Sequence, residues 1–318
     1  MKGLIALLLG ILLSLATGKI VIPLLKKLKA GQVILSCVES HKNKGGTPTM
    51  GGLFFILSAT IVFLILSSKR DVTTILCLCI GLGFMVVGFL DDYIKLKYKR
   101  NLGLRPYQKI IFQLLISVIG GLYLYRNGLT HQTLPFLNIR INLKFWIIPF
   151  SIICFIATVN CVNLTDGLDG LCGGVSCVFL TFFSVIMFFT KSSAVSDDML
   201  ILSLALCGSI LGFLFFNTHP AKVFMGDTGS LSIGGFIASM AIFTGNAFLI
   251  LILGIMFVLS GISVIIQVLY FKKTKGKRIF KMAPFHHHLE MSGLSEERIC
   301  FIYKGITFVC GVALLIFL

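Results

Sequence analysis

Charged residues are scarce in this sequence. Aspartate, glutamate, lysine and arginine make up 13% of its 318 residues, about half of the usual share in soluble domains. Hydrophobic residues make up 57%, and the mean hydropathy is +0.99. A soluble chain of this composition would have too little polar surface to stay in solution, so a large soluble core is excluded.

A CxxC pair is also absent, although the sequence contains ten cysteines. Most of them lie in apolar stretches, where free cysteine usually acts as a small buried hydrophobic residue. Neither a disulfide framework nor a zinc site is indicated by this spacing. The net charge is +16, but in a membrane protein these charges belong to the loops, so we predict no nucleic-acid partner.

Long apolar stretches fill most of the chain. A membrane helix needs about 20 such residues, and the stretch 231–271 is about twice too long for one helix. We divide it at Thr244-Gly245-Asn246, where turn-forming residues cluster. A cleaved signal peptide is not favoured, because the first apolar run is too long and no small-residue cleavage site follows. The predicted spans are 3–25, 51–67, 72–90, 108–125, 145–162, 171–190, 199–216, 229–245, 247–271 and 299–318.

Lysine and arginine are distributed unequally between the two sides of these spans. Nineteen lie on one side and seven on the other, and the richer side is expected in the cytoplasm. We therefore predict an all-α, polytopic integral membrane protein with about ten transmembrane helices and both termini outside. Residues 1–318 form one transmembrane domain, with cytoplasmic segments near 26–50, 91–109, 160–170, 217–230 and 272–298.

Acidic residues number only twelve, and most of them lie on the predicted cytoplasmic side. A carboxylate close to hydrocarbon costs several kcal/mol, so this concentration needs a reason. Asp91 and Asp92 end the third span, at the unfavourable pole of the helix dipole. Bound metal or lysines that follow would offset their charge. A solvated pair at a helix end is the alternative.

The most specific motif is NCVNLTDGLDG, residues 160–170. Its two asparagines and two aspartates lie between apolar helices, and their oxygens suit a hard cation or a nucleotide. The motif FMGDTGS, residues 224–230, places Asp227 at the start of the eighth span. Asp227 is either a helix N-cap or a ligand of Mg²⁺.

Two further motifs lie in predicted cytoplasmic loops. PFHHHLE, residues 284–290, suits phosphate binding better than a tetrahedral metal, because consecutive histidines rarely converge; a solvated loop is the alternative. KNKGGTPTMGG, residues 42–52, resembles a phosphate cradle but lacks P-loop spacing. Together the five motifs supply carboxylates for a metal and cations for phosphate. We therefore predict Mg²⁺-assisted phosphoryl transfer at the cytoplasmic face.

These motifs resemble those of the polyprenyl-phosphate N-acetylhexosamine-1-phosphate transferase superfamily, over essentially the whole chain. They are GGTPTMGG (45–52), DDYIK (91–95), NCVNLTDGLDG (160–170) and FMGDTGSL (224–231). PFHHHLE (284–290) favours the muramoyl-pentapeptide branch. The resemblance implies a bacterial cytoplasmic-membrane enzyme that uses Mg²⁺. Its UDP-N-acetylmuramoyl-pentapeptide donor and undecaprenyl phosphate acceptor would give lipid I and UMP, the first membrane step of peptidoglycan synthesis. Family members are often homodimers.

The resemblance also implies roles for individual residues. Asn163 and Asp227 would lie near Mg²⁺, and Asp91, supported by Asp92, would deprotonate the acceptor phosphate or attack the donor. His287 would be catalytic, with His286 and His288 at the phosphates or sugar, and Phe224 would stack on uracil. Gln267 would line the pocket, although a lone polar residue in a span is as often an interhelical hydrogen-bond partner. The other predicted substrate-binding residues are Lys44, Lys95, Lys99, Lys109, Asn160, Asp166, Gly167, Leu168, Asp169 and Asn217.

Three alternatives remain. A sister-branch enzyme would transfer N-acetylglucosamine 1-phosphate. A secondary transporter would explain intramembrane polar residues, but it predicts charges at the midplane and an internal repeat. A prenyltransferase would carry DDxxD clusters, whereas only Asp166 and Asp169 have DxxD spacing. The sequence leaves open whether transfer is direct or proceeds through a phospho-enzyme, and also the lipid length and the third residue of the stem peptide.

Overall fold

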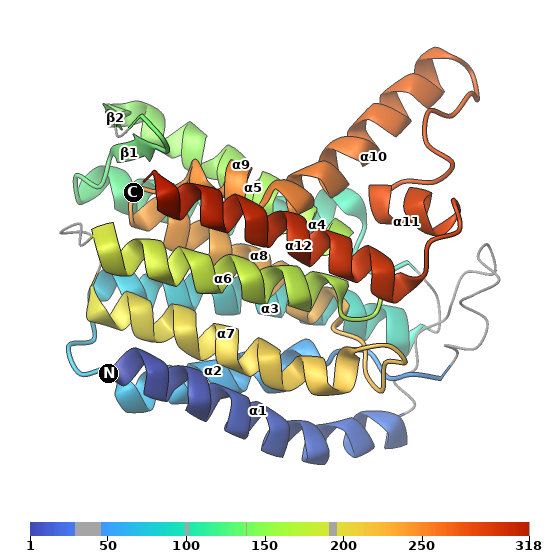
Figure 1. The fold of residues 1–318 in the computed structure, drawn as a ribbon, viewed down its shortest axis with the longest axis horizontal. Coiled ribbons are helices and arrows are strands. Elements are labelled where there is room, and N and C mark those ends of the chain that lie inside the picture. Colours follow the sequence, from blue (N-terminus) through green and yellow to red (C-terminus); the bar gives the residue numbers. More distant parts are fainter. Residues whose placement is uncertain (29–45, 99–101, 138, 191–195, 318) are drawn as a thin grey trace.

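A computed structural model describes residues 1–28, 46–98, 102–137, 139–190 and 196–317 (Figure 1). The prediction of an all-α protein is confirmed, apart from one short hairpin. In chain order the elements are α1 (Lys2–Lys27), α2 (Gly52–Leu66), α3 (Val72–Lys97), α4 (Pro106–Arg126), β1 (His131–Leu134), β2 (Ile139–Asn142), the 3-10 turn η2 (Lys144–Trp146), α5 (Ile147–Thr165), α6 (Leu171–Thr190), α7 (Asp197–Asn217), α8 (Gly226–Phe243), α9 (Leu249–Leu253), α10 (Ile255–Lys273), α11 (Phe285–Glu290) and α12 (Glu296–Ile316).

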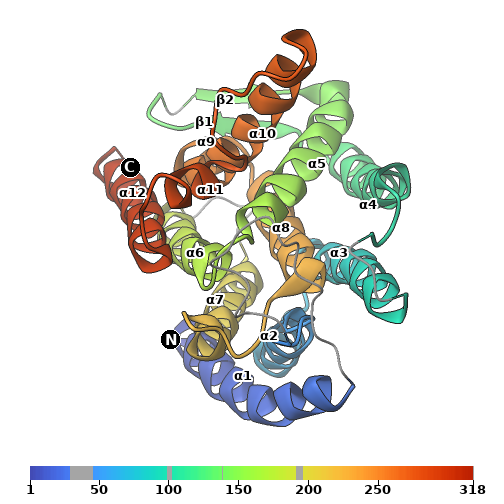
Figure 2. The same ribbon diagram turned by 90° about the vertical axis from the view of Figure 1, so that its right-hand side faces the viewer.

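Within the described residues, eight helices are long and apolar enough to cross a membrane. They are α1, α3, α4, α5 with η2, α6, α7, α10 and α12. The prediction of a polytopic membrane protein is therefore confirmed, whereas the number of spans stays a prediction. The predicted second span corresponds to α2, which has only 15 residues. The predicted eighth span corresponds to α8, which the other helices surround (Figure 2).

Helix α8 lies at the centre of the bundle and is buried continuously from Thr228 to Phe243. It faces protein on all sides, so its sequence is rich in small residues that let neighbouring backbones approach closely. A β-carbon on Gly88 of α3 would overlap the Asp227 carbonyl at the start of α8. About one turn further along α8, the Ser232 hydroxyl donates a hydrogen bond to the Gly81 carbonyl of α3 at 2.8 Å. The end of α3 is thereby held against the beginning of α8.

The prediction of one continuous helix over 247–271 is wrong. The helix is interrupted at Gly254, whose backbone (φ −94°, ψ 20°) departs from helical geometry between α9 and α10. The division at Thr244-Gly245-Asn246 is confirmed, because α8 ends at Phe243. After the interruption α10 leans away from the bundle, and α11 lies beside it (Figure 1).

An antiparallel hairpin, β1 and β2, covers the turn between α8 and α9. Its buried residue Gln132 donates to the Ile242 carbonyl at 2.9 Å and accepts from the Ala247 amide at 3.0 Å. These bonds satisfy backbone groups where α8 ends, which would otherwise be costly to bury. This element was not predicted from the sequence.

The two chain ends lie at the same end of the bundle, and α11 lies at the opposite end (Figure 1). Helices α1 and α7 run side by side, and α12 returns along α6 to bring the C-terminus back. The loops after α3, α5 and α7 therefore open toward the α11 end. This arrangement gathers the motifs of the described chain at one end of the molecule.

Candidate active site

Three carboxylates meet where α3 ends and α8 begins. Asp91, Asp92 and Asp227 each offer an oxygen, and these oxygens lie within 4.8 Å of one another. The two helices are antiparallel neighbours, so the last turn of one lies beside the first turn of the other. Such a group of carboxylates could hold a metal ion.

Asp92 serves as a cap for α8. Its Oδ1 accepts from the Asp227 amide at 3.2 Å, and its Oδ2 accepts from the Thr228 amide at 2.9 Å and the Thr228 hydroxyl at 2.7 Å. A carboxylate at a helix N-terminus satisfies unpaired amides and complements the helix dipole. Asp227 was the N-cap candidate in the sequence, whereas the capping carboxylate comes from α3.

Asp227 is the centre of the hydrogen-bond network. Its Oδ1 accepts from the Asn163 side-chain amide at 2.8 Å. Its Oδ2 accepts from Lys95 Nζ at 3.1 Å and from Lys109 Nζ at 3.0 Å. Asn163 also donates to Ser230 Oγ at 2.8 Å, which fixes the amide toward α8. Four helices, α3, α4, α5 and α8, thus contribute to one polar centre.

Asp91 makes a different set of contacts from Asp92. It forms an ion pair with Lys95 at 2.6 Å between Nζ and Oδ2, and its Oδ1 accepts from the Leu104 amide at 2.8 Å. Lys95 and Lys109, predicted to bind substrate, thus lie against the carboxylates, and their role toward substrate stays a prediction. The two ammonium groups can bind phosphate oxygens, and the three carboxylates beside them can hold a cation.

The loop 166–170 lies between this network and α11. A β-carbon on Gly167 would overlap His286 Nε2 and would approach His287 Nε2 to 3.0 Å, so a larger residue here would displace the histidines. Beside it, burial raises the pKa of Asp166 to about 8, and the negative charges of Asp227 and Asp92 act in the same direction. The close approach at Gly167 shows that the loop packs tightly against α11.

Asn217 holds the same loop from the other side. Its Oδ1 accepts from the Gly170 amide at 3.1 Å, and its Nδ2 donates to the Val223 carbonyl at 2.9 Å. Phe224 pairs through its backbone with Pro48 and Gly51, at 2.8 Å and 2.9 Å. Both residues thus connect the loop before α8 to other segments of the site.

The three histidines of α11 have different surroundings. His286 is fully buried, and neither ring nitrogen has a hydrogen-bond partner in the described part of the chain. Burial and the neighbouring His287 hold the pKa of His286 well below its usual range, so this ring is neutral. His287 Nδ1 lies 2.9 Å from Glu290 Oε2, and His288 Nδ1 accepts from the Lys281 amide at 3.1 Å. That all three histidines contact phosphate therefore stays a prediction. The burial of His286 disfavours a charged contact between this ring and phosphate.

Gln267 bonds to backbone rather than to another helix. Its Oε1 accepts from the amides of Ile279 and Phe280 at 3.2 and 3.0 Å, and its Nε2 donates to the Phe280 carbonyl at 3.1 Å. It orders the segment that leads to α11.

The remaining predicted residues lie elsewhere. Asn160 pairs with Gln113 of α4, whose Oε1 accepts from Asn160 Nδ2 at 2.8 Å. Leu168 is buried. Lys44 and Lys99 lie outside the described residues.

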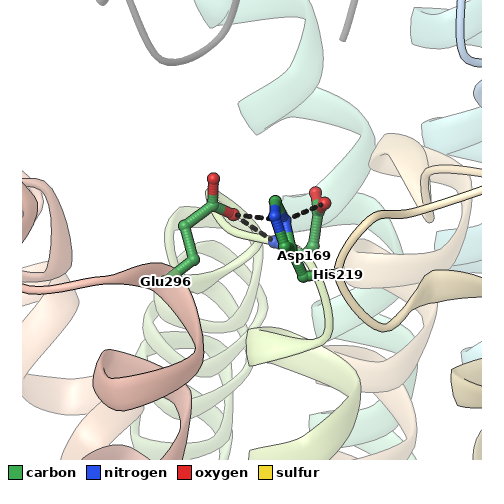
Figure 3. Close-up of side chains that lie close together, drawn as sticks. All are labelled: Asp169, His219 and Glu296. Carbon is green, nitrogen blue, oxygen red and sulfur yellow. Dashed lines mark hydrogen bonds and ion pairs between the residues drawn. The ribbon is translucent and has the colours of Figure 1, made fainter. Parts of the chain in front are cut away.

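A second group of side chains gathers around Asp169, and two of its members, His219 and Glu296, were not predicted as site residues. Asp169, predicted to bind nucleotide, has His219 Nδ1 at 3.1 Å from its Oδ2, and Glu296 joins them from α12 (Figure 3). His219 and Glu296 both lie in predicted cytoplasmic segments. That location was their only signal, because neither belongs to a recognised motif.

The chain is similar to known proteins over most of its length. The chain matches glycosyl transferase family 4 over residues 73–245. It is 46% identical over 305 residues to a protein of Clostridium botulinum (strain Alaska E43), covering 96% of this chain and 93% of the relative. It is 45% identical over 309 residues to one of Clostridium beijerinckii, covering 96% and 93%, and 45% identical over 301 residues to one of Halalkalibacterium halodurans, covering 93% and 91%. Each relative is named phospho-N-acetylmuramoyl-pentapeptide-transferase. The resemblance drawn from the motifs is confirmed, and the chain belongs to glycosyl transferase family 4, among the phospho-N-acetylmuramoyl-pentapeptide transferases.

Proposed function

We propose that this protein transfers phospho-N-acetylmuramoyl-pentapeptide from its UDP-linked donor to undecaprenyl phosphate, giving lipid I and UMP. The observation that carries the proposal is the convergence of three carboxylates with Lys95 and Lys109 at one end of a membrane bundle. The names of the relatives supply the donor and acceptor classes. The chain acts as one transferase domain in the bacterial cytoplasmic membrane, with this end in the cytoplasm.

The donor atoms at Asp227 fit Mg²⁺, which prefers carboxylate and amide oxygens. Two lysine ammonium groups lie against Asp227 Oδ2, so the site already favours positive charge there. Asp227 and Asn163 would hold the ion, with Asp91 close by. When bound, Mg²⁺ would neutralise charge on the donor diphosphate and make its phosphorus more electrophilic.

The chain's own residues then divide the work. Lys95 and Lys109 bind phosphate oxygens. Asp91 either takes the proton from the acceptor phosphate, which attacks the donor phosphorus and displaces UMP, or attacks that phosphorus itself and displaces UMP. In the second case the acceptor phosphate then displaces Asp91 from the phospho-sugar. Asp92 caps α8 and so holds Asp227, at the start of α8, next to Asp91, at the end of α3. Asp166 and the loop that contains Gly167 bind the nucleoside, with Phe224 against uracil. A dimer stays a prediction.

The decisive experiment measures UMP release by the purified full chain in detergent with undecaprenyl phosphate and Mg²⁺. UDP-N-acetylmuramoyl-pentapeptide and UDP-N-acetylglucosamine are supplied at equal concentration in separate reactions. We expect rapid release from the first donor and little from the second. Equal or faster use of the second donor would assign the protein to the sister branch. Release from neither donor would contradict the transferase assignment.

Substitution of His287 by alanine is expected to lower turnover at least about 100-fold, the usual effect of losing one positioned acid, base or electrostatic group. Glu290 holds His287 Nδ1, which leaves Nε2 directed at the Gly167 side of the loop 166–170. UMP release measures the effect. His131→Ala is the matched control, because His131 is exposed on the hairpin β1 and β2 at the other end of the bundle. Equal activity of the two variants would remove His287 from the catalytic residues.

A further inference from the structure

A buried amide lies inside the apolar helix α4. Gln113 is fully buried, about two turns from the start of a helix that is long and apolar enough to cross a membrane. The other buried residues of α4 are Ser117, Gly120, Gly121 and Leu124. A buried amide destabilises the protein unless it is hydrogen-bonded, and this penalty is large in a helix surrounded by lipid. The position of Gln113 therefore depends on its partner.

Asn160 of α5 is that partner, and the two side-chain amides bond reciprocally. Asn160 Nδ2 donates to Gln113 Oε1 at 2.8 Å, and Gln113 Nε2 donates to Asn160 Oδ1 at 3.4 Å. Asn160 Nδ2 also donates to the Ile156 carbonyl at 2.8 Å, which fixes this side chain on α5. Both reciprocal bonds need the two side chains at the same height. Sliding α4 along α5 by one residue, about 1.5 Å, would strain or break them.

This pair lies about one helical turn deeper in the bundle than Lys109 and Asn163. Lys109 precedes Gln113 by four residues on α4, so the two share one face of that helix. Asn163 follows Asn160 by three residues on α5, with the same result. Lys109 Nζ donates to Asn163 Oδ1 at 3.5 Å and to Asp227 Oδ2 at 3.0 Å. The height of α4 that satisfies Gln113 is therefore the height at which Lys109 reaches the carboxylate network.

A second side-chain hydrogen bond ties α4 to a neighbouring helix, at the opposite end of α4. Tyr123 Oη and Thr73 Oγ1 of α3 lie 2.9 Å apart. Tyr123 is 14 residues from Lys109, about 21 Å along the helix axis. Among the described residues, Gln113 thus makes the interhelical side-chain bond of α4 that lies nearest to Lys109. Tyr123 holds the outer end of α4, and Gln113 holds the end that carries Lys109.

We propose that Gln113 is a positioning residue that acts through Lys109. With Asn160 it holds α4 at the height along α5 where the Lys109 ammonium group contacts Asp227 Oδ2. The inference rests on the proposed function, in which Lys109 binds phosphate oxygens. Misplacement of such a group by about 1 Å can lower turnover about 100-fold. Nucleoside binding is assigned to the separate loop 166–170, so loss of Gln113 should lower kcat and leave KM for the donor nearly unchanged.

The first test compares kcat and KM for UMP release by the purified full chain in detergent. Gln113→Leu, which nearly keeps the volume but removes the amide, should lower kcat about 10- to 100-fold and change KM for the donor less than about threefold. Tyr123→Phe is the matched control, because it removes the other interhelical hydrogen bond of α4 and keeps the ring. We expect the control to retain its kcat. A loss in the control equal to that in Gln113→Leu would show a general effect of loosening α4 and would overturn the proposal.

Two combinations of variants test whether Gln113 acts through Lys109. In a Lys109→Ala protein, the addition of Gln113→Leu should cause no further loss of kcat, whereas independent effects would multiply. Exchange of the pair, Gln113→Asn together with Asn160→Gln, rebuilds the reciprocal bonds. It should restore at least about half of the activity lost in the Gln113→Asn protein. Multiplied losses, or an exchanged pair no more active than Gln113→Asn, would contradict the proposal.

Crystal structures of the unmutated and Gln113→Leu proteins give a readout that does not depend on activity. We expect Lys109 Nζ to move out of hydrogen-bond range of Asp227 Oδ2 in the variant. An unchanged contact between Lys109 and Asp227 would overturn the inference. An unmutated protein that releases no UMP would instead contradict the proposed function, and the displacement of Lys109 would still be measurable.

Discussion

Asp227→Asn is expected to lower UMP release at least about 1000-fold, which corresponds to about 4 kcal/mol of lost transition-state stabilisation. Asp227 is the residue on which Asn163, Lys95 and Lys109 converge. The amide keeps the shape of the side chain but removes the charge that would hold Mg²⁺ and order the two lysines. Turnover is measured over a range of Mg²⁺ concentrations.

The matched control for this change is Asp197→Asn, because Asp197 is exposed at the start of α7, at the opposite end of the bundle. We expect the control to keep its activity, and both variants to unfold at nearly the temperature of the unmutated protein in detergent. Normal turnover of a folded Asp227→Asn protein at low Mg²⁺ would exclude the metal role. Restoration by high Mg²⁺ would instead place Asp227 near the ion without making it indispensable.

Asp91→Asn and Asp92→Asn are expected to fail for different reasons. Asp91 pairs with Lys95 and accepts from the Leu104 amide but does not cap a helix, so its loss should reduce turnover by about 100- to 10,000-fold while the fold persists. Asp92 accepts three hydrogen bonds at the start of α8, and its replacement should lower the free energy of unfolding by about 2 kcal/mol. Thermal unfolding measured beside UMP release separates the two outcomes.

The contrast between these neighbours is the informative result. A stable Asp92→Asn protein combined with an unfolded Asp91→Asn protein would reverse the roles assigned to them. Donor labelled in its sugar phosphate, supplied without acceptor, then distinguishes the two functions of Asp91. Label retained on the protein indicates attack by the carboxylate, and its absence in an active enzyme indicates a base.

Several features of the site could be predicted from the sequence because they depend on local pattern. Asp91, Asn163 and Asp227 lie at the ends of apolar stretches, and a membrane leaves few reasons for carboxylates or amides there. Because successive loops alternate between the two sides of the membrane, the predicted spans place these three residues on the same side. Contacts of Lys95 and Lys109 with Asp227 follow from the same placement.

Other features depended on packing that no local pattern contains. His286 belongs to a motif with His287 and His288, yet α11 turns His286 inward against Gly167, where burial keeps it neutral. Asp92 looks equivalent to Asp91 in sequence, but helical rotation directs it to the amides of α8. The position of Gln132 under the end of α8 could not be predicted, because its side-chain bonds reach residues more than a hundred positions away.

The sequence by itself determined the membrane class, the helical stretches and the side on which the chemistry gathers, because hydrophobicity and charge act locally along the chain. Only the tertiary structure decided which carboxylate caps α8, which histidine is buried and which residues join Asp169. Those outcomes arise from distances between segments that are remote in sequence, set by close packing around α8. The interruption at Gly254 belongs with them, since an apolar stretch permits a straight helix and only its neighbours decide where it turns.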